Sequence, residues 1–271
     1  MVGQKTRKQK TDDYVVAIPS YKRTTTLTEK SLATLKKYKI PSSKIYIFVA
    51  DKDEEEIYRN TVPKDLYNKL VVGVKGVKEV RNFITGYFPV GKHLICMDDD
   101  IKGFIEYDEK EKRHEKPLIS LEKVIKRGFE ECKESGARMW GIYASANGFF
   151  MKPTVSTDLK FIVGCFFGII NPGLKELTLP ISEKDDYYRS LRMYELDKSV
   201  IRLNFIAPKT SYYKEPGGMQ SDPERKKKQE LAVKFLLKEY PMWVKVNPSR
   251  KSGFMEVRIK DSEIKGKANS N

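Results

Sequence analysis

The chain has 271 residues, of which 39% are hydrophobic, and it carries a formal net charge of +15. This length and apolar content suit one substantial α/β domain. No window approaches eighteen consecutive apolar residues, and the amino-terminal MVGQKTRKQK has no apolar core of the signal-peptide kind, which argues against a membrane anchor and predicts a protein of a cytoplasm-like compartment.

Cysteine and histidine are scarce, which narrows the possible chemistry. Cys96, Cys132 and Cys165 are scattered and show no CxxC spacing, so we expect buried free thiols. With His93 and His114 as the only histidines, zinc chemistry or a Ser-His nucleophile system has few residues to draw on. Catalysis is therefore expected to depend on carboxylates.

The first half of the chain alternates strand and helix patterns. It predicts strands at Tyr14–Ser20, Ile45–Ala50, Leu70–Val74 and His93–Met97, and helices at Leu27–Tyr38 and Val77–Tyr87. Short links between these elements favour a parallel sheet with right-handed crossovers. Because functional groups collect beyond the carboxyl ends of such strands, Ser20, Asp51 and Asp98 to Asp100 are expected to converge.

The second half is less regular. The charged stretch 108–116 is interpreted as a solvated hairpin or mobile loop, and Ser120–Glu134 as a capped helix. The later elements are expected as strands Met139–Ser145, Phe161–Ile170, Val200–Ile206 and Phe254–Ile259, and helices Asp185–Asp197 and Asp222–Glu239, with Asp222 as N-cap and Pro223 at the first helical position.

Three consecutive aspartates follow the fourth strand. Adjacent carboxylates raise each other's pKa unless a cation lies between them. Side chains two positions apart in an extended segment emerge on one side, so Asp98 and Asp100 are expected to bind one ion while Asp99 points elsewhere. Oxygen ligands suit Mg²⁺ or Mn²⁺, which keep positions open for phosphate. The structural alternative is a strand-terminating turn or a helix cap.

Four motifs in order resemble a glycosyltransferase of the GT-A fold, close to family 2. They are VVAIPSYKR, VADKDE, GVKEVRNFITGYF before LICMDDD, and EKDDYYRSLRMY, together spanning about Tyr14 to Leu196. The resemblance implies a Rossmann-like α/β domain with a central, mostly parallel sheet and helices on both faces. It also implies a nucleotide-sugar donor, expected to be a UDP-sugar, and a DXD motif that chelates Mn²⁺ or Mg²⁺ with the diphosphate.

The resemblance assigns donor-site roles residue by residue. It places Pro19, Ser20 and Arg23 in the nucleotide pocket, Asp51 against the base or ribose, and Arg81 near the donor phosphate or sugar. Asp98 and Asp99 complete the donor site, and Asp98 and Asp100 bracket the metal. Arg23 and Arg81 as surface cations, and Asp51 as a helix cap, remain alternatives.

The same resemblance points to the general base. The family's acidic pair that opens a helix corresponds here to Asp185-Asp186, which gives Asp186 the position of the base, with Asp185 beside it and Glu183 as a third candidate. A single base opposite the leaving group implies inversion at the anomeric carbon. Electrostatic capping of the helix is the structural alternative for this pair.

The basic excess lies mainly at the two ends of the chain. Residues 1–10 hold four basic groups and no acid, and residues 209–271 hold fifteen basic and eight acidic groups. Such asymmetry favours a polyanion such as nucleic acid, with phosphorylated small substrates or simple solubility as the alternatives. No histidine follows His114 to match the late metal-binding histidine of many GT-A enzymes, so either the aspartates and the diphosphate suffice or the glycine loop at residues 217–219 closes over the donor with Lys214 or Arg225. The candidate acceptor or nucleic-acid contacts are Lys214, Gly217, Gly218, Arg225, Lys226, Lys227, Trp243, Arg250 and Lys251.

The order of motifs and the basic carboxyl-terminal region resemble the TET/JBP-associated glycosyltransferases of phages and kinetoplastids. That resemblance implies transfer of a sugar to 5-hydroxymethylcytosine or 5-hydroxymethyluracil in DNA. Two alternatives stay open: a family 2-like enzyme acting on a glycan or protein, and a non-catalytic nucleic-acid-binding protein on the same scaffold. The oligomeric state is not indicated.

The domain boundaries follow from these assignments. We expect a basic flexible tail over 1–12 and a GT-A domain over 13–208, divided into a nucleotide-sugar-binding half (13–103) and an acceptor half (104–208). A basic loop-helix-strand extension packed on the same domain is expected over 209–262, and a disordered tail over 263–271.

Overall fold

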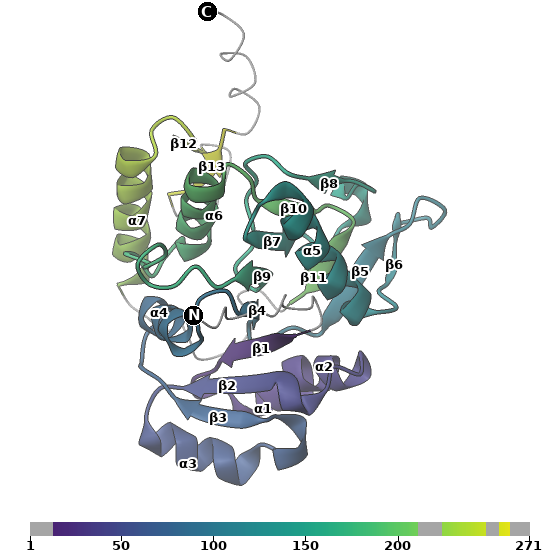
Figure 1. The fold of residues 1–271 in the computed structure, drawn as a ribbon, viewed down its shortest axis with the longest axis vertical. Helices are drawn as coiled ribbons and strands as arrows, with labels where there is room; N and C mark the ends of the chain where they lie inside the picture. Colours follow the sequence, from purple (N-terminus) through teal and green to yellow (C-terminus); the bar gives the residue numbers. More distant parts are fainter. Residues whose placement is uncertain (1–12, 211–223, 248–254, 261–271) are drawn as a thin grey trace, which may run out of the picture.

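The computed structural model describes residues 13–210, 224–247 and 255–260. These residues form a mixed α/β fold around one large sheet, which Figure 1 shows with helices packed on it. Among the helices that lie in these ranges, none is long and apolar enough to cross a lipid bilayer.

The first half of the chain builds the parallel part of the sheet. β1 lies between β2 and β4, β3 pairs with β2, and all of these pairs are parallel. The strands are β1 (Tyr14–Pro19), β2 (Ile45–Val49), β3 (Lys69–Val72) and β4 (His93–Met97). Their carboxyl ends therefore share one edge, as the sequence predicts.

The second half extends the sheet to eight strands in the order β3-β2-β1-β4-β9-β7-β10-β8. Here β9 is antiparallel to both β4 and β7, while β10 is parallel to β7 and antiparallel to β8. The strands are β7 (Met139–Ile142), β8 (Val155–Ser156), β9 (Phe166–Ile170) and β10 (Ile201–Leu203). The sheet is thus mostly parallel, and β9 and β8 run in the opposite direction.

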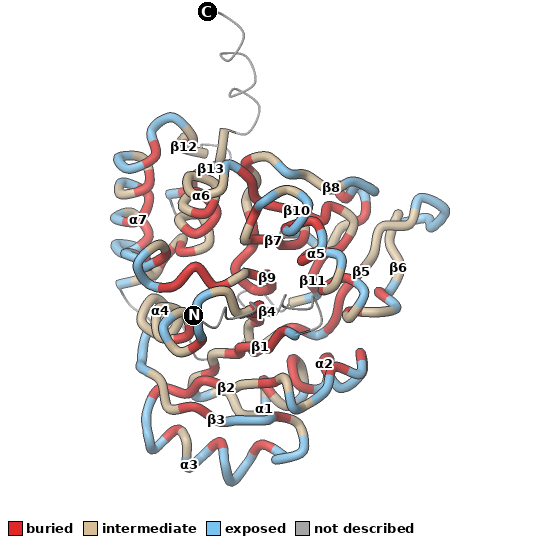
Figure 2. Tube along the Cα trace, in the orientation of Figure 1, coloured by how far each residue is buried: buried red, intermediate tan, exposed pale blue. Residues whose placement is uncertain are grey.

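Helices cover both faces of this sheet, as predicted. One face packs against η1 (Leu27–Leu32), which α1 (Thr24–Thr26) directly precedes, and against α2 (Ala33–Lys37), α3 (Lys52–Thr61) and α5 (Leu121–Ser135). The other face packs against α4 (Val77–Tyr87) and α6 (Asp185–Asp197). Alternate residues of β1 divide between the two layers: Val16 and Ile18 face the first, and Val15 and Ala17 face the second. Figure 2 shows the buried strands between the more exposed helices.

Two smaller sheets complete the fold. β5 (Gly103–Tyr107) pairs with β6 (Glu115–Pro117) and β11 (Ile206–Lys209). The hairpin of β12 (Val244–Val246) and β13 (Val257–Ile259) follows α7 (Arg225–Glu239). Leu236, Tyr240 and Val257 of this carboxyl-terminal region form one apolar cluster with Leu191 of α6. Short 3-10 turns lie at η2 (Ser42–Lys44), η3 (Lys64–Leu66) and η4 (Gly148–Phe150).

Some predicted boundaries differ from the structure. The strand expected over Val200–Ile206 is two strands, β10 and β11, in different sheets, and Asn204 between them donates side-chain bonds to Thr154 Oγ1 (3.1 Å) and Ser156 Oγ (2.9 Å). The expected strand Phe161–Ile170 begins only at Phe166. Helix α3 is not among the predicted elements, because its DKDEEE start has few apolar residues. The predicted cap Asp222 lies outside the described residues.

The three cysteines match the prediction. Cys96, Cys132 and Cys165 are all buried and unpaired by disulfides. Burial raises the pKa of the Cys96 and Cys132 thiols. Thiols kept protonated in this way act as small apolar side chains of the core.

Packing around Trp140 gives a stability prediction. A Cβ added at Gly128 of α5 would lie 2.2 Å from Trp140 Cδ2, and Trp140 is fully buried. We expect Gly128→Ala to lower the free energy of unfolding by about 1–3 kcal/mol, because an overpacked core must shift. Urea denaturation measures the effect. The control is Gly86→Ala in α4, where the nearest atom is Cδ1 of the exposed Leu174, so that stability should stay level or rise. Equal losses in both variants would contradict the packing argument.

Candidate active site

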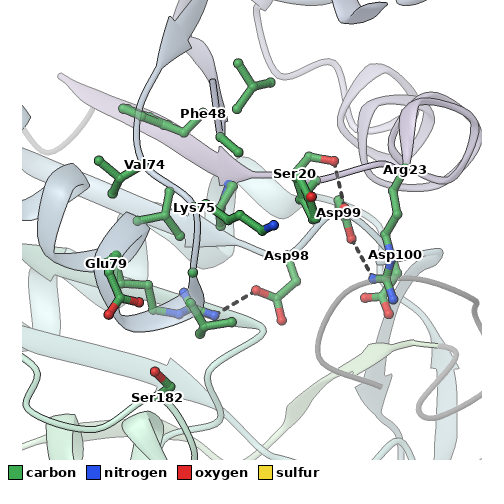
Figure 3. Close-up of a pocket in the computed structure, with 18 of the residues that line it drawn as sticks. Ser20, Arg23, Phe48, Val74, Lys75, Glu79, Asp98, Asp99, Asp100 and Ser182 are labelled. Carbon is green, nitrogen blue, oxygen red and sulfur yellow. Dashed lines mark hydrogen bonds and ion pairs between the residues drawn. The ribbon is translucent and has the colours of Figure 1, made fainter. Parts of the chain in front are cut away.

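A cavity of about 660 Å³ opens at the carboxyl edge of β1, β2 and β4. The loops after these strands, the first turns of α4 and the segment before α6 surround it, and Lys228 of α7 closes one side. Figure 3 shows its principal side chains. The lining residues are Pro19, Ser20, Tyr21, Arg23, Phe48, Val49, Ala50, Val74, Lys75, Gly76, Val77, Glu79, Val80, Arg81, Asp98, Asp99, Asp100, Ser182, Glu183 and Lys228.

Asp99 fixes the loop after β1. Its carboxylate accepts a hydrogen bond from Ser20 Oγ at 2.7 Å and from Arg23 Nη1 at 3.2 Å, and Ser20 Oγ lies 2.8 Å from the Tyr58 hydroxyl. Burial is the main cause that raises the pKa of Asp99 to about 6. Asp99 therefore points toward β1 and Arg23, as Figure 3 shows, and differs in direction from Asp98.

Asp98 and Asp100 supply the remaining oxygens of the triplet. One oxygen of Asp98 accepts from Arg81 Nη2 at 2.9 Å, and its side chain is 35% exposed to the cavity. Burial and then the charge of Asp98 raise the pKa of Asp100. Two carboxylates that repel in this way offer the hard oxygen donors that suit Mg²⁺ or Mn²⁺.

The protein would supply few ligands to such a metal ion. Among the described residues, no group of three or more His, Cys, Asp or Glu is arranged to hold an ion. Asp98 and Asp100 as the only protein ligands fit an ion that takes its other oxygens from a diphosphate and water. The residues present therefore fit a metal that arrives with a phosphorylated ligand.

The acidic pair at the start of α6 divides between two environments. Asp185 is buried, with Oδ2 3.1 Å from Arg81 Nε and in contact with Arg189 Nη2. Asp186 is partly buried, and its Oδ1 accepts from the backbone N–H of Tyr187 at 2.9 Å. Burial first, and the charge of Asp185 second, raise the pKa of Asp186 to about 6.

Gly164 brings the aspartate triplet and α6 together. The carbonyl of Cys165 accepts from the backbone N–H of Asp98 at 2.8 Å, and that of Gly164 accepts from Arg81 Nη2 at 3.4 Å. A Cβ added at Gly164 would lie 3.2 Å from Cβ of Asp186. Asp186 and Asp98 thus lie on either side of the same short segment, although Asp186 is not among the cavity-lining residues.

An apolar slot occupies the other end of the cavity. Phe48, Val49 and Val74 line it, and Lys75 Nζ lies 5.3 Å from the centroid of the Tyr21 ring. Lys75 belongs to the loop between β3 and α4, where Gly76 adopts φ +110° and caps α4. In Figure 3 the Lys75 ammonium points into the cavity that also holds Asp98. The arrangement suits a flat ring with a phosphorylated tail.

The other predicted donor residues have clear positions. Pro19, Ser20, Arg23 and Arg81 line the cavity. Asp51 does not: it is exposed, and its side chain caps α3 by accepting from the Glu54 N–H at 2.9 Å. The third base candidate, Glu183, lines the cavity and accepts from Gln229 Nε2 at 3.2 Å, and burial raises its pKa.

The predicted acceptor contacts are only partly described. Arg225, Lys226 and Lys227 lie in the first turn of α7, with Arg225 Nε 3.9 Å from Glu183 Oε1. Trp243 packs against Tyr194 and Tyr240, with ring centroids 5.5 and 5.9 Å away. It therefore belongs to an apolar cluster. Outside the described residues lie Lys214, Gly217, Gly218, Arg250 and Lys251.

Comparison with known proteins identifies the fold. No protein-family model and no curated protein sequence matches the chain. A mannosyltransferase from Pyrobaculum calidifontis, solved with GDP-Man and Mn²⁺, is similar in structure, with a TM-score of 0.51 and 14% identity. The match covers 75% of this chain and 58% of that protein, so this chain matches little more than half of its length.

Two further structures are more distant. A mycobacterial protein matches with a TM-score of 0.46 and 8% identity, covering 92% of this chain and 84% of that one. A protein from Desulfovibrio desulfuricans, described as a nucleotide-diphospho-sugar transferase, matches with a TM-score of 0.41 and 11% identity, covering 84% and 98%. The fold of this chain is similar to that of the mannosyltransferase, and its mostly parallel sheet is as predicted.

Proposed function

We propose that the chain is a metal-dependent glycosyltransferase that takes its sugar from a nucleotide-sugar. One observation carries the proposal: the cavity combines an apolar slot at Phe48 and Val74, the cations Lys75 and Lys228, and the carboxylates Asp98 and Asp100. These three features match the base, the diphosphate and the metal of a nucleotide-sugar. The donor is proposed to be a UDP-sugar, and GDP is the natural comparison.

The chain's own groups suffice for the remaining chemistry. The carboxylate of Asp186 removes the proton of the acceptor hydroxyl, and the resulting oxygen bonds to the anomeric carbon. The bond from that carbon to the donor diphosphate breaks, its electron pair stays on the diphosphate oxygen, and the anomeric centre inverts. Bound Mn²⁺ or Mg²⁺, held by Asp98 and Asp100, would stabilise the negative charge of the leaving diphosphate.

The acceptor is proposed to be 5-hydroxymethylcytosine or 5-hydroxymethyluracil in DNA. The net charge of +15 favours a polyanion, and the basic first turn of α7 adjoins the donor cavity through Lys228. A hydroxymethyl group supplies the hydroxyl that the reaction needs. The base must be unpaired or extruded from a duplex to reach the site.

One experiment tests the proposed activity and the proposed acceptor separately. The protein is incubated with Mn²⁺, UDP- and GDP-sugars, and hydroxymethylated DNA, unmodified DNA or glycan acceptors. We expect release of the nucleoside diphosphate only with hydroxymethylated DNA, together with a sugar-sized mass gain of the nucleoside. Release with glycans alone would show that the acceptor is a glycan and not DNA. DNA binding with no release under any condition would contradict the proposal that the chain is an enzyme.

Lys228 gives a prediction for the donor site. We expect Lys228→Gln to weaken binding of UDP or GDP about tenfold, which is the loss of one charge-assisted contact to phosphate, and to leave binding of the nucleoside unchanged. Isothermal titration calorimetry measures both. Lys227→Gln is the matched control, since Lys227 is the preceding residue of α7 but does not line the cavity. Equal weakening in both variants would contradict a phosphate contact.

A further inference from the structure

Consecutive acids at the start of α6 hold different partners. Asp186 accepts a backbone N–H of its own helix and lies against Gly164. Asp185 is 13% exposed at its side chain and contacts two guanidinium groups, those of Arg81 and Arg189. Both guanidiniums contact Oδ2 of Asp185, so this carboxylate is engaged by the protein's own cations. Asp185 therefore has some role other than that of the base.

Arg81 links Asp185 to the metal-binding end of β4. Its Nε lies 3.1 Å from Asp185 Oδ2, and its Nη2 lies 2.9 Å from Asp98 Oδ1. Asp98, Arg81, Asp185 and Arg189 thus form a continuous charge row across β4, α4 and α6. Side-chain exposure is 35% at Asp98, 12% at Arg81, 13% at Asp185 and 3% at Arg189. The charge row leads from the cavity into the core.

Arg189 ends the charge row in apolar surroundings. Its guanidinium lies 4.2 Å from the centroid of the Phe167 ring on β9, and its Nη1 has no hydrogen-bond partner among the described residues. An apolar side chain would avoid the desolvation cost of a charge at this place. Stability alone therefore does not explain Arg189.

Charge balance does explain it. Without Arg189, the single cation Arg81 would be shared between Asp98 and Asp185. With Arg189, Asp185 is neutralised from its other side, and Arg189 also attracts the charge of Asp186. The strength with which Arg81 holds Asp98 therefore depends on the two inner members of the charge row, Asp185 and Arg189.

We propose that Asp185 and Arg189 are positioning residues that set, through Arg81, how strongly Asp98 is held away from a bound metal. The proposal rests on the proposed function, in which Asp98 is a metal ligand. It assigns separate roles to the two neighbouring acids: Asp186 moves the acceptor proton, and Asp185 tunes the donor site. Neither positioning residue lines the cavity.

The test uses substitutions of opposite charge. Asp185→Asn leaves Arg81 with one carboxylate, so that Arg81 holds Asp98 more tightly, and we expect about tenfold weaker Mn²⁺ binding. Arg189→Met draws Arg81 toward Asp185 and releases Asp98, and we expect Mn²⁺ to bind several-fold more tightly. Free Mn²⁺ is measured by electron paramagnetic resonance at saturating UDP or GDP, with the full chain.

Three further variants control for damage to the fold. Arg192→Met removes the next arginine of α6, which pairs with Glu195 at 2.6 Å outside the charge row, and should leave Mn²⁺ binding unchanged. Arg189→Lys keeps the charge and should behave like the wild type. The double variant Asp185→Asn with Arg189→Met removes one charge of each sign, and its Mn²⁺ affinity should return close to that of the wild type.

The outcomes are distinguishable. Shifts of opposite sign in the two single variants, with recovery in the double variant, support the charge row. Shifts in the same direction, reversed shifts or no shift in variants that fold would overturn it. If the wild type binds no Mn²⁺ in the presence of either UDP or GDP, the proposed function fails first, independently of the charge row.

Discussion

Asp186→Asn is expected to lower the rate of sugar transfer by about 10²- to 10⁴-fold, the usual contribution of a general base. Asparagine keeps the size of the side chain and still accepts the backbone N–H of Tyr187, but it cannot take a proton. Initial rates at saturating donor and acceptor measure the change. Binding of the donor nucleotide should stay unchanged, because Asp186 does not line the cavity.

Glu183→Gln is the matched comparison for this prediction. Glu183 lies three residues earlier, lines the cavity and is buried, but pairs with Gln229 and Arg225. It should retain most of the transfer activity. If Glu183→Gln abolished transfer and Asp186→Asn did not, Glu183 would be the base and the assignment of Asp186 would be wrong.

The pH dependence of the wild type follows from the raised pKa of Asp186, which is about 6 against an ordinary value of 3.8. The base must be deprotonated, so transfer should increase as the pH rises through about 6 and level off above it. Asp186→Asn should lack this limb. A wild-type rate that did not change as the pH rises through about 6 would contradict the assignment of Asp186 as the base.

The raised pKa of Asp186 also predicts that stability falls over the pH range in which activity rises. A carboxyl whose pKa is higher in the folded than in the unfolded state loses stability as the pH rises from about 4 to about 6, because the folded protein must hold a buried charge. Asp186→Asn removes that cost. We therefore expect the variant to be more stable than the wild type at pH 8 by on the order of 1–3 kcal/mol, with a smaller difference at pH 4. Urea denaturation at the two pH values checks this.

Asp98→Asn is expected to abolish Mn²⁺-dependent binding of the nucleoside diphosphate and to reduce transfer about 10³-fold or more. The amide loses the negative charge that a divalent ion requires. Its 35% exposure makes Asp98 a side chain whose replacement should leave the fold intact. Calorimetry of UDP or GDP binding with and without Mn²⁺ measures the loss of binding, and thermal unfolding checks that the fold is intact.

Asp99→Ala separates binding from folding at the adjacent position. Asp99 is 6% exposed and bonds to Ser20 and Arg23, so its removal leaves a partly buried guanidinium without this carboxylate. We expect a loss of about 2–3 kcal/mol in the free energy of unfolding. If Asp98→Asn lowered the free energy of unfolding as much as Asp99→Ala, the conclusion that Asp98 serves binding and Asp99 serves folding would be contradicted.

Local pattern was sufficient for the first half of the fold. Short, mostly apolar runs such as IYIFV and HLICM predict strands without any knowledge of their partners, and short crossovers favour a parallel arrangement. The same logic places Ser20 and the aspartate triplet at one edge, where they do line one cavity. The loop GVKG after β3 carries a comparable signal, because it follows a parallel strand and precedes a helix, and it could have identified Lys75.

Local pattern failed where a role depends on distant partners. The sequence DDYYR does not indicate that Asp185 is held by Arg81, about a hundred residues earlier, while Asp186 is not. Arg189 and Lys228 resemble ordinary surface cations in sequence, yet one is buried against Phe167 and the other lines the cavity. Trp243, within a basic segment, resembles a stacking platform but packs against Tyr194 and Tyr240.

The sequence by itself determined the parallel strands of the first half, the mostly parallel sheet and the position of the acidic triplet at its carboxyl edge. Hydrophobic periodicity and short connections are local properties, and they suffice for these features. Only the tertiary structure decided which acids are paired and which face the cavity. Burial and ion pairing are set by side chains far apart in the chain, such as Arg81 between Asp98 and Asp185, and no local pattern encodes them.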